Sequence, residues 1–376
     1  MMDWSKYTIT RCNDEQTLRS RSFHLEKWGV RSHGYTPEQY YRKFEVMDEE
    51  EWAVNDGIVH WALVPRSETS TLDLLSHVET WRRKSLIKRP GQTAPEEVVS
   101  YGIAYVYTPE KHQGHGYGRH LLQLLHYILA PLPTLPSFPT TWGDQPSLEG
   151  FNDAAFSFLF SGVGDKFYAS CRRGEGDDSL VGWVPIPLTN RHWDLSKVAQ
   201  EAQETHEADQ TGWKWLTVED LTAVEEEAIE DMKLELGKDT SDRIQLAISP
   251  EQGCFRQHAL RNTLTPSGIA NPSPPRHYGL SLPPDPHTNK RPYIIYTFPE
   301  SATETQALRI CYISHPFPWS AVVAAAKKEN CTLIRCWGPR AGWDDHGAEL
   351  KPSGGVPGLA VYGHNEEECD WRWLEL

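Results

Sequence analysis

Three closely spaced glycines form the segment of this sequence best suited to binding a ligand. Gly114, Gly116 and Gly118 lie between a β-rich apolar segment and a helical apolar segment. Glycine lets backbone N–H groups approach a ligand because no side chain stands between them. The unpaired N–H groups and the dipole of a helix N-terminus both favour negative charge. The stretch therefore predicts a pyrophosphate-binding loop, made of Gln113, Gly114, His115, Gly116, Tyr117, Gly118 and Arg119.

Other phosphate-binding motifs do not fit this stretch. It lacks the Gly-Lys-Ser/Thr ending of a nucleotide P-loop. It also lacks the later acidic residue of a dinucleotide-binding fingerprint, and its strand is not the first in the chain. Taken alone, the three glycines are equally compatible with a tight turn that binds nothing. Arg119 and His120, at the start of the helical segment, are expected to add positive charge.

The elements that position this loop are predicted from apolar periodicity. Residues 98–107 read as a strand, and residues 119–129 carry Leu and Ile at helical spacing. The proline-rich stretch 131–139 ends that helix. The other elements expected in the first half are strands at 7–11, 58–64 and 74–87, the last with a possible turn, and a helix at 15–29.

The second half reads as a mixture of helices and strands. We expect a helix at 217–236, capped by Thr217 and Asp220, after a flexible linker around 200–211. The Pro- and Ser-rich stretch 262–290 is predicted to be a long irregular connection. The remaining predicted elements are strands at 292–298, 307–313, 331–337 and 357–362, and a helix at 318–329.

Composition narrows the class of protein. The chain has 376 residues, enough for two domains, and a formal net charge of −15. This charge argues against a protein that wraps nucleic acid, since such proteins neutralise phosphates with Lys and Arg. The 7 cysteines are scattered, which predicts reduced thiols and no metal site. No apolar stretch is long enough to span a membrane, so we expect a cytoplasmic protein.

Residues 113–118 match the Q/R-x-x-G-x-G/A motif of the GNAT superfamily of acetyl-CoA-dependent N-acetyltransferases. The runs HVETWRRKSLI, YGIAYVYTPEKHQGHGYGRHLL and LFSGVGDKFYASC resemble, in this order, the fungal lysine N-acetyltransferase family. The likeness is firm over 74–185 and loose after 215, and the loops 131–147 and 172–182 and the stretch 262–290 depart from it. It implies an α+β fold: a mixed, mostly antiparallel GNAT sheet with flanking helices, plus a C-terminal α+β domain. The expected division is an acetyl-CoA-binding domain at 1–195, a linker at 196–215 and a C-terminal domain at 216–376.

The resemblance also implies roles for individual residues. In the superfamily, the strand before the loop diverges from its neighbour and pairs with the pantetheine arm of acetyl-CoA. This role falls on Tyr105, Val106 and Tyr107. A tyrosine on the helix after the fifth strand often protonates the departing thiolate, and Tyr168 matches it. A packed aromatic ring with a locally satisfied hydroxyl is the equal alternative for Tyr168.

Five further residues, on two segments of the chain, are candidates on the acceptor side. Glu79, in the strand beside the cofactor strand, is the best carboxylate to accept a proton from the amine, and His77 lies on the same face at period two. The solvent-exposed side of a strand is the alternative for Glu79. Arg256 and Arg261, with His258, lie on a probable helix, where a guanidinium could bind a substrate carboxylate. A solvated basic helix face is the alternative there.

The sequence therefore predicts an N-acetyltransferase that uses acetyl-CoA and a small amine. The resemblance favours the side-chain amine of free L-lysine, attacking the thioester directly. Another small amine, such as a polyamine or a specialised metabolite, is the first alternative, and a non-catalytic acyl-CoA-binding protein is the second. A histone or protein acetyltransferase is less favoured, because a closing second domain leaves little room for a peptide. The oligomeric state is left open.

Overall fold

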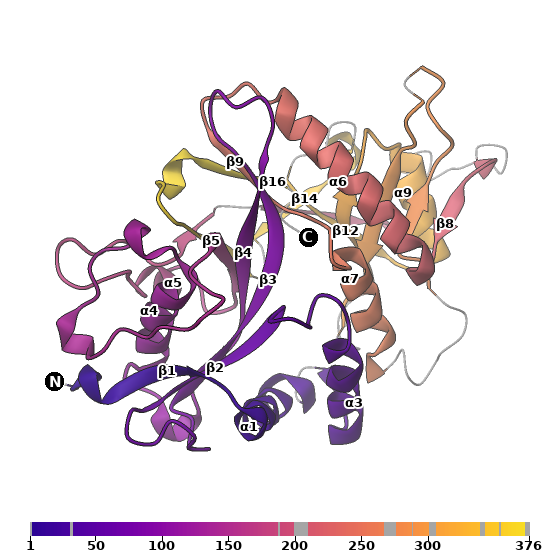
Figure 1. The fold of residues 1–376 in the computed structure, drawn as a ribbon. Coiled ribbons are helices and arrows are strands. Elements are labelled where there is room, and N and C mark those ends of the chain that lie inside the picture. Colours follow the sequence, from indigo (N-terminus) through magenta and orange to yellow (C-terminus); the bar gives the residue numbers. More distant parts are fainter. Residues whose placement is uncertain are drawn as a thin grey trace.

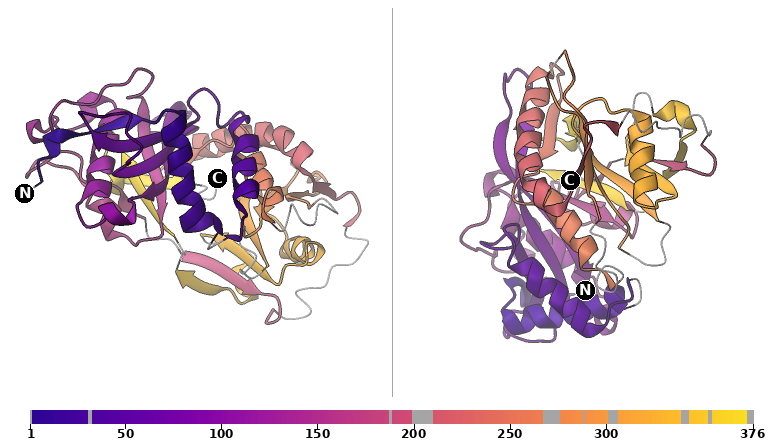
Figure 2. Two further views of the ribbon diagram at one scale, coloured as in Figure 1. Left: turned by 90° about the horizontal axis from the view of Figure 1, so that it is seen from below. Right: turned by 90° about the vertical axis from the view of Figure 1, so that its right-hand side faces the viewer.

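The computed structural model describes residues 2–30, 33–186, 189–198, 210–266, 276–287, 289–300, 306–338, 343–352 and 355–372. The predicted linker at 200–211 therefore falls mostly outside the described residues, as do 267–275 and residue 288 of the stretch 262–290. Within the described part, the strands form two sheets, and helices cover both faces of the first (Figures 1 and 2).

The first sheet has nine strands in the part of the chain that the structure describes. Its order is β1-β2-β3-β4-β5-β15-β6, and β9 pairs with β3 and with β16. The pairs β4–β5 and β9–β16 are parallel, and the remaining pairs are antiparallel. The strands are β1 (Tyr7–Arg11), β2 (Ile58–Pro65), β3 (Ser76–Lys88), β4 (Glu96–Tyr107), β5 (Ala154–Ser161), β6 (Val184–Pro185), β9 (Ile244–Ile248), β15 (Val356–Val361) and β16 (Cys369–Arg372).

The second sheet has seven strands among the described residues, in the order β14-β7-β13-β12-β11-β10-β8. Only the β12–β13 pair is parallel in this set. The strands are β7 (Thr189–Asp194), β8 (Lys214–Leu216), β10 (Gly279–Ser281), β11 (Tyr293–Thr297), β12 (Ala307–Ile313), β13 (Leu333–Trp337) and β14 (Glu349–Pro352). Both sheets are thus mixed and mostly antiparallel, which confirms the prediction for the first sheet.

Helices pack on both faces of the first sheet. Figure 1 shows α4 and α5 on one side, and α3, α6 and α7 with the second sheet on the other. The α4 face encloses an apolar core that includes Val78, Tyr101 and Leu121. The helices are α1 (Asp14–His24, continued by a π-helical turn at Leu25–Val30), α3 (Pro37–Asp48), α4 (Tyr117–Leu129), α5 (Lys166–Ala169), α6 (Leu221–Lys238), α7 (Cys254–Thr263) and α9 (Trp319–Lys328).

Several local predictions are confirmed, and one is wrong. The strands expected at 7–11 and 307–313 have these bounds, and the Thr217–Asp220 capping box is present before α6. The stretch 262–290 is not wholly irregular, because it contains the end of α7 and strand β10. Strand β10 has only three residues and pairs with β11, which follows it closely in the sequence, and with β8, which lies far before it.

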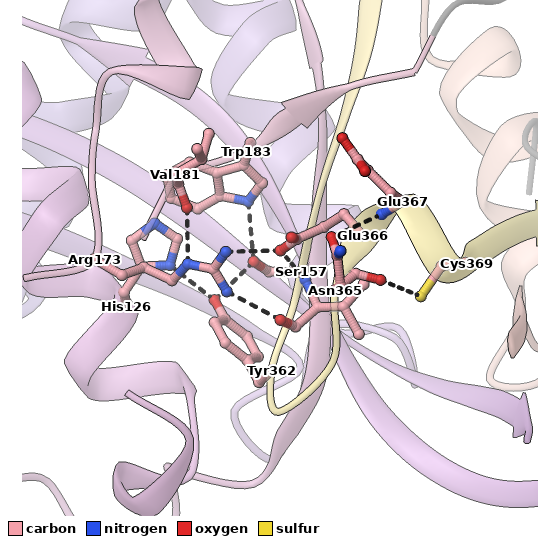
Figure 3. A network of polar contacts seen from close by, with 11 residues as sticks. His126, Ser157, Arg173, Val181, Trp183, Tyr362, Asn365, Glu366, Glu367 and Cys369 are labelled. Atoms are coloured by element: carbon pink, nitrogen blue, oxygen red, sulfur yellow. Dashed lines mark hydrogen bonds and ion pairs between the residues drawn. The ribbon is translucent and has the colours of Figure 1, made fainter. Parts of the chain in front are cut away.

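The segment after β15 returns to the first half of the chain and is fixed there by a buried network (Figure 3). The Arg173 guanidinium donates to the carbonyls of Val181 at 2.8 Å and Val361 at 2.9 Å, and pairs with Glu366 at 2.7 Å. The Tyr362 hydroxyl lies 2.8 Å from Ser157 Oγ. Residues 356–372 are therefore integral to the first sheet, so sheet membership does not divide at one point of the sequence.

Candidate functional site

The glycine loop has the backbone geometry that the sequence predicts for an anion site. Gly114 and Gly116 have φ of 79° and 85°, in the left-handed region, and Gly116 is the N-cap of α4. No side chain caps this helix. In the described residues, no acceptor binds the backbone N–H groups from Gly114 to Arg119. A row of unpaired donors, of which Gly114 to Gly116 belong to exposed residues, therefore lies at the positive end of a helix.

Steric contacts explain two of the glycines. A Cβ at Gly118 would lie 2.9 Å from Thr108 Oγ1, so only glycine lets α4 pack this closely on the chain after β4. A Cβ at Gly116 would lie 3.3 Å from the Trp4 ring. Gly114 meets nothing within 4 Å and faces open space.

The positive charge near the loop is smaller than the sequence suggested. His120 is buried and stacks on Trp4, with ring centroids 4.4 Å apart. Burial, together with the charge of Arg66, lowers the pKa of His120 to about 4, so the imidazole is neutral at pH 7. The prediction that His120 adds charge is therefore wrong. Arg119 is exposed and remains as a cation beside the loop.

Strand β4 is irregular at Tyr105–Tyr107, the residues expected to pair with the pantetheine arm of acetyl-CoA. Its pairing with β3 shifts from His77–Tyr107 to Glu79–Ala104, which leaves one extra residue on β4. Tyr105 has φ of 51°, so the irregularity is a β-bulge. Pairing of β4 with β5 ends at Ile103–Leu159, although β4 continues to Tyr107 and β5 to Ser161. Beyond Ile103 the two strands no longer pair, as expected for a strand that diverges from its neighbour.

The bulge turns adjacent side chains toward different surroundings. Val106 packs against the core under α4. Tyr105 lies on the opposite face, where its ring stacks on His24 with centroids 4.6 Å apart. The point where β4 and β5 separate is therefore flanked by the glycine-loop helix on one face and by Tyr105 on the other.

Glu79 lies on the Tyr105 face and is almost completely buried, which excludes the alternative of a solvent-exposed strand position. Trp81 Nε1 donates to Glu79 Oε2 at 3.3 Å. The other oxygen, Oε1, lies 3.3 Å from His24 Nδ1 and 3.5 Å from His60 Nδ1. Burial is the main cause that lowers the pKa of His24 to about 3 and that of His60 to about 4, so both are neutral at pH 7. The carboxylate thus accepts one hydrogen bond, from Trp81, and has two neutral imidazoles within 3.5 Å of its other oxygen, and among the described residues no Lys or Arg pairs with it.

His77 is fully buried beneath α1 and does not line the cavity beside Glu79. Its Nδ1 lies 3.2 Å from His24 Nε2 and 3.1 Å from Ser20 Oγ. Burial, with smaller effects of the neighbouring His24 and His60, holds the pKa of His77 well below its usual range. The structure therefore places His77 behind His24, as a residue that orients it.

A small cavity adjoins Glu79 on this face. Its free volume is about 10 Å³, close to the space that one water molecule needs. Elements α1, α3, β2, β3 and β4 of the first half and α7 of the second half enclose it, and its lining residues are Arg21, Lys43, Phe44, Met47, Asp48, Ile58, Glu79, Trp81, Tyr105 and Arg261.

Of the two predicted arginines, the structure brings only Arg261 to the cavity. Arg261 pairs with Glu300 at 2.5 Å, and its guanidinium lies 5.8 Å from the Trp81 ring centroid. Arg256 instead pairs with Glu50 through both of its terminal nitrogens, at 2.7 and 3.0 Å. The α7 surface is thus engaged with the first half of the chain rather than solvated.

Sequence reasoning missed Lys43 and Glu300. Lys43 is buried, and its Nζ donates to Glu300 at 3.0 Å and to the Tyr35 hydroxyl at 3.2 Å. The sequence does indicate that Lys43 is buried, since it lies on the apolar face of α3 between Tyr40 and Met47. Glu300 carries no such signal, because it follows β11 in irregular backbone.

Tyr168 lies on α5, directly after the fifth strand, as the resemblance implies. Its ring contacts Phe167 and Trp183, and the described residues offer its hydroxyl no hydrogen-bond partner. Burial, with a smaller effect of Cys171, raises the pKa of Tyr168 to about 12, so the hydroxyl stays protonated. Phe167 lies near Gly118, which places α5 beside the start of α4.

A larger open groove, of about 430 Å³, lies at the opposite end of β4. It includes Val98, Asp153 and His364, and none of the glycine-loop or Glu79-cavity residues. The groove therefore lies at the end of β4 that is away from the glycine loop and is separate from the Glu79 cavity.

Comparison with known proteins supports the fold. No protein-family profile and no curated protein sequence matches the chain. A GCN5-related N-acetyltransferase from Anabaena variabilis ATCC 29413 superposes with a TM-score of 0.53 at 10% identity, covering 94% of this chain and 72% of its own. The chain has the GNAT fold.

Two further structures agree. A GCN5-related N-acetyltransferase from Kribbella flavida and a conserved protein from Enterococcus faecalis V583, described as a probable N-acyltransferase, both give a TM-score of 0.51. They are 10% and 11% identical, and each comparison covers 95% of this chain and 72% of the other. The GNAT likeness therefore spans both sheets. None of these three structures is described as a lysine-specific enzyme.

Two properties of the whole chain complete the description. All seven cysteines are free thiols, and all but Cys12 are buried. Among the described residues, no helix combines the length and apolar character needed to cross a membrane.

Proposed function

We propose that this protein is an acetyl-CoA-dependent N-acetyltransferase that acts on a small amine. One observation carries the proposal: the point where β4 and β5 separate has unpaired helix-terminal donors on one face and the buried Glu79 on the other. A ligand whose pyrophosphate lies on the loop can extend through this opening toward Glu79. The residues present fit acetyl-CoA, because the loop offers N–H donors and space beside Gly114.

Each proposed residue has a defined task. The loop residues 113–119 hold the pyrophosphate, and the β4 backbone at Tyr105–Tyr107 aligns the pantetheine arm. Acetyl-CoA, when bound, supplies the activated acetyl group as a thioester. Glu79 accepts the proton from the acceptor ammonium, and the lone pair of the amine then forms the new C–N bond as the C–S bond breaks. Tyr168 donates its hydroxyl proton to the departing thiolate, and the tyrosinate takes the surplus proton of the acylated nitrogen through water, so that a neutral amide and a free thiol remain.

The acceptor that we favour is an amino acid, in first place free L-lysine through its side-chain nitrogen. The resemblance suggests lysine, and Arg261 beside the cavity gives a group that can bind a carboxylate. An amine without a carboxylate, such as a polyamine, is the alternative within enzymes. A non-catalytic acyl-CoA-binding protein would use the same loop and is the alternative from another class.

A panel of amines distinguishes these possibilities. Purified protein is mixed with acetyl-CoA and, separately, lysine, ornithine, cadaverine and spermidine, and free thiol is followed over time. Thiol release with lysine above all others supports the favoured acceptor. Release with the polyamines alone indicates the alternative enzyme. Tight binding of CoA without turnover on any amine contradicts the enzymatic proposal.

A further inference from the structure

One carboxylate joins two cations at the wall of the Glu79 cavity. Glu300 pairs with Arg261 at 2.5 Å and with Lys43 at 3.0 Å. Both cations line the cavity, whereas Glu300 lies behind them. Lys43 comes from α3, Arg261 from α7 and Glu300 from the chain after β11, so this triad unites the two halves of the protein.

The positive charges of Lys43 and Arg261 require the Glu300 carboxylate beside them. Lys43 is buried, with only 5% of its side chain exposed, and burial lowers its pKa. Burial alone would raise the pKa of Glu300, but Arg261 and Lys43 outweigh it and lower that pKa to about 2. Burying the Lys43 and Arg261 cations together without an anion would cost much free energy, so these two cations must keep an anionic partner.

The cavity is too small for any acceptor in this state. About 10 Å³ holds one water, whereas an amino acid needs many times that space. Glu79, Trp81 and Tyr105 lie in the sheet, which fixes their backbone. Glu300 lies in irregular backbone after β11, whereas Lys43 and Arg261 lie in helices.

Trp81 connects the two ends of the proposed acceptor site. Its indole N–H donates to Glu79, where the amine would lose its proton. Its ring also lies beneath the Arg261 guanidinium, which is now paired with Glu300. An acceptor that lies along the indole, with its amine toward Glu79, directs its other end to Arg261, the cation with which Glu300 now pairs.

We infer that Glu300 is an internal ligand that occupies the carboxylate position of the acceptor and must be displaced before the acceptor binds. This inference rests on the proposed function and deepens it by naming the residue that controls entry. A carboxylate-bearing amine replaces Glu300 on Lys43 and Arg261, and the two cations stay paired. An amine without a carboxylate leaves them unpaired, so the site rejects it.

The test compares lysine with cadaverine, which differ only by the carboxylate. Binding of each to the CoA-loaded protein is measured by calorimetry, for wild type and for Glu300→Gln. The substitution removes the internal competitor and makes the site more positive. We expect lysine to bind roughly tenfold more tightly, a gain of about 1.4 kcal/mol. Cadaverine should bind no better, because it is a dication.

Two further variants separate this function from a structural role. Glu50→Gln breaks the Glu50–Arg256 pair, which also links the α3 region to α7 but does not line the cavity. It should leave the ratio of lysine to cadaverine affinity unchanged. Glu300→Asp keeps the charge and shortens the side chain, so it should shift the ratio in the same direction by a smaller factor. If Glu300→Gln does not fold, the lysine and cadaverine affinities of Glu300→Asp still test the inference.

The outcomes are distinct from those that test acetyl transfer. Unchanged or weaker lysine binding in both Glu300 variants overturns the inference, as does an equal gain for cadaverine. Absence of binding by either amine in every variant overturns it as well. The calorimetric reading needs no turnover, so an inactive protein that still gains lysine affinity would contradict the enzymatic proposal and support the displaced carboxylate.

Discussion

Glu79 Oε1 lies 3.3 Å from Nδ1 of His24, so a carboxylate on β3 is in close contact with a side chain of α1. His24 also stacks on Tyr105, at the bulge of β4. One imidazole thus positions both the proposed proton acceptor and the strand that bends toward the cofactor. Because His24 is neutral, it orients Glu79 without neutralising its charge.

Glu79→Gln removes the proposed base and keeps the shape of the side chain. We expect kcat to fall by roughly 10²-fold or more, since general-base catalysis contributes about that much. Affinity for CoA should stay within twofold, because the loop lies on the other face. Steady-state kinetics and calorimetry give the two values. Glu97→Gln, at the far end of β4, is the control and should leave kcat unchanged.

Gly116→Trp places a large side chain where the helix-terminal donors must remain accessible. We expect loss of CoA binding by about 100-fold or more, with a decrease of about 1–3 kcal/mol in the free energy of unfolding from the positive φ. Calorimetry and urea unfolding measure the two effects. Gly150→Trp also places tryptophan at a positive φ, in open space outside the loop, and controls for the strain. CoA binding retained in Gly116→Trp would show that the loop has another purpose.

Tyr168→Phe removes only a hydroxyl that has no partner in the described part of the chain. Stability should be unchanged, and kcat should fall by roughly 10²-fold if the hydroxyl protonates the thiolate. Tyr127→Phe is the control, because it removes a hydroxyl that does have a partner: the Tyr127 hydroxyl donates to the Pro136 carbonyl at 3.1 Å. It should cost about 1 kcal/mol of stability and leave kcat unaffected. Unchanged turnover in Tyr168→Phe would remove Tyr168 from the mechanism.

His60 makes stability depend on pH. Burial lowers its pKa to about 4, against about 6.5 in an unfolded chain. Between these values the unfolded state binds more protons, so the free energy of unfolding falls as the pH falls from about 6.5 to 4. The contribution is at most about 3.5 kcal/mol, since the two pKa values differ by about 2.5 and each pKa unit corresponds to about 1.4 kcal/mol. Urea unfolding at several pH values should show a flatter dependence for His60→Leu.

The exposed His287 supplies the control for this titration. His287→Leu should leave the pH dependence of unfolding as in the wild type. An identical pH dependence for His60→Leu and the wild type would mean that His60 titrates alike in the folded and unfolded states.

Glu366→Gln breaks the buried pair with Arg173 (Figure 3). Removal of one member of such a pair leaves an uncompensated buried charge, and we expect a loss of about 3–5 kcal/mol. Glu45→Gln removes the partner of Arg42 in a pair whose side chains are 63% and 70% exposed, and should change stability by less than about 0.5 kcal/mol. Equal effects in the two variants would show that the network does not anchor residues 356–372.

The local features of this fold could be predicted from the sequence, whereas the long-range contacts could not. Strand β4, the left-handed Gly116 and helix α4 follow from β-branched residues, glycine and apolar spacing within about thirty residues of chain. Lys43 and Glu300 are separated by 257 positions, and no periodicity relates them. Strand β15 lies between β5 and β6 for the same kind of reason, since its partner is fixed by the packing of the whole chain. His120 was misread because its neighbour Trp4, which buries it, comes from the N-terminal segment.

The most direct test of the central claim is the stoichiometry of acetyl transfer. Wild-type protein and Gly116→Trp are each mixed with acetyl-CoA and lysine, and free thiol and acetylated amine are measured in the same samples by absorbance and mass spectrometry. The proposal predicts one acetylated amine for each thiol released, with no thiol released when the amine is omitted and no product from Gly116→Trp. Thiol release that does not depend on any amine, or CoA binding without product from any amine, would contradict it.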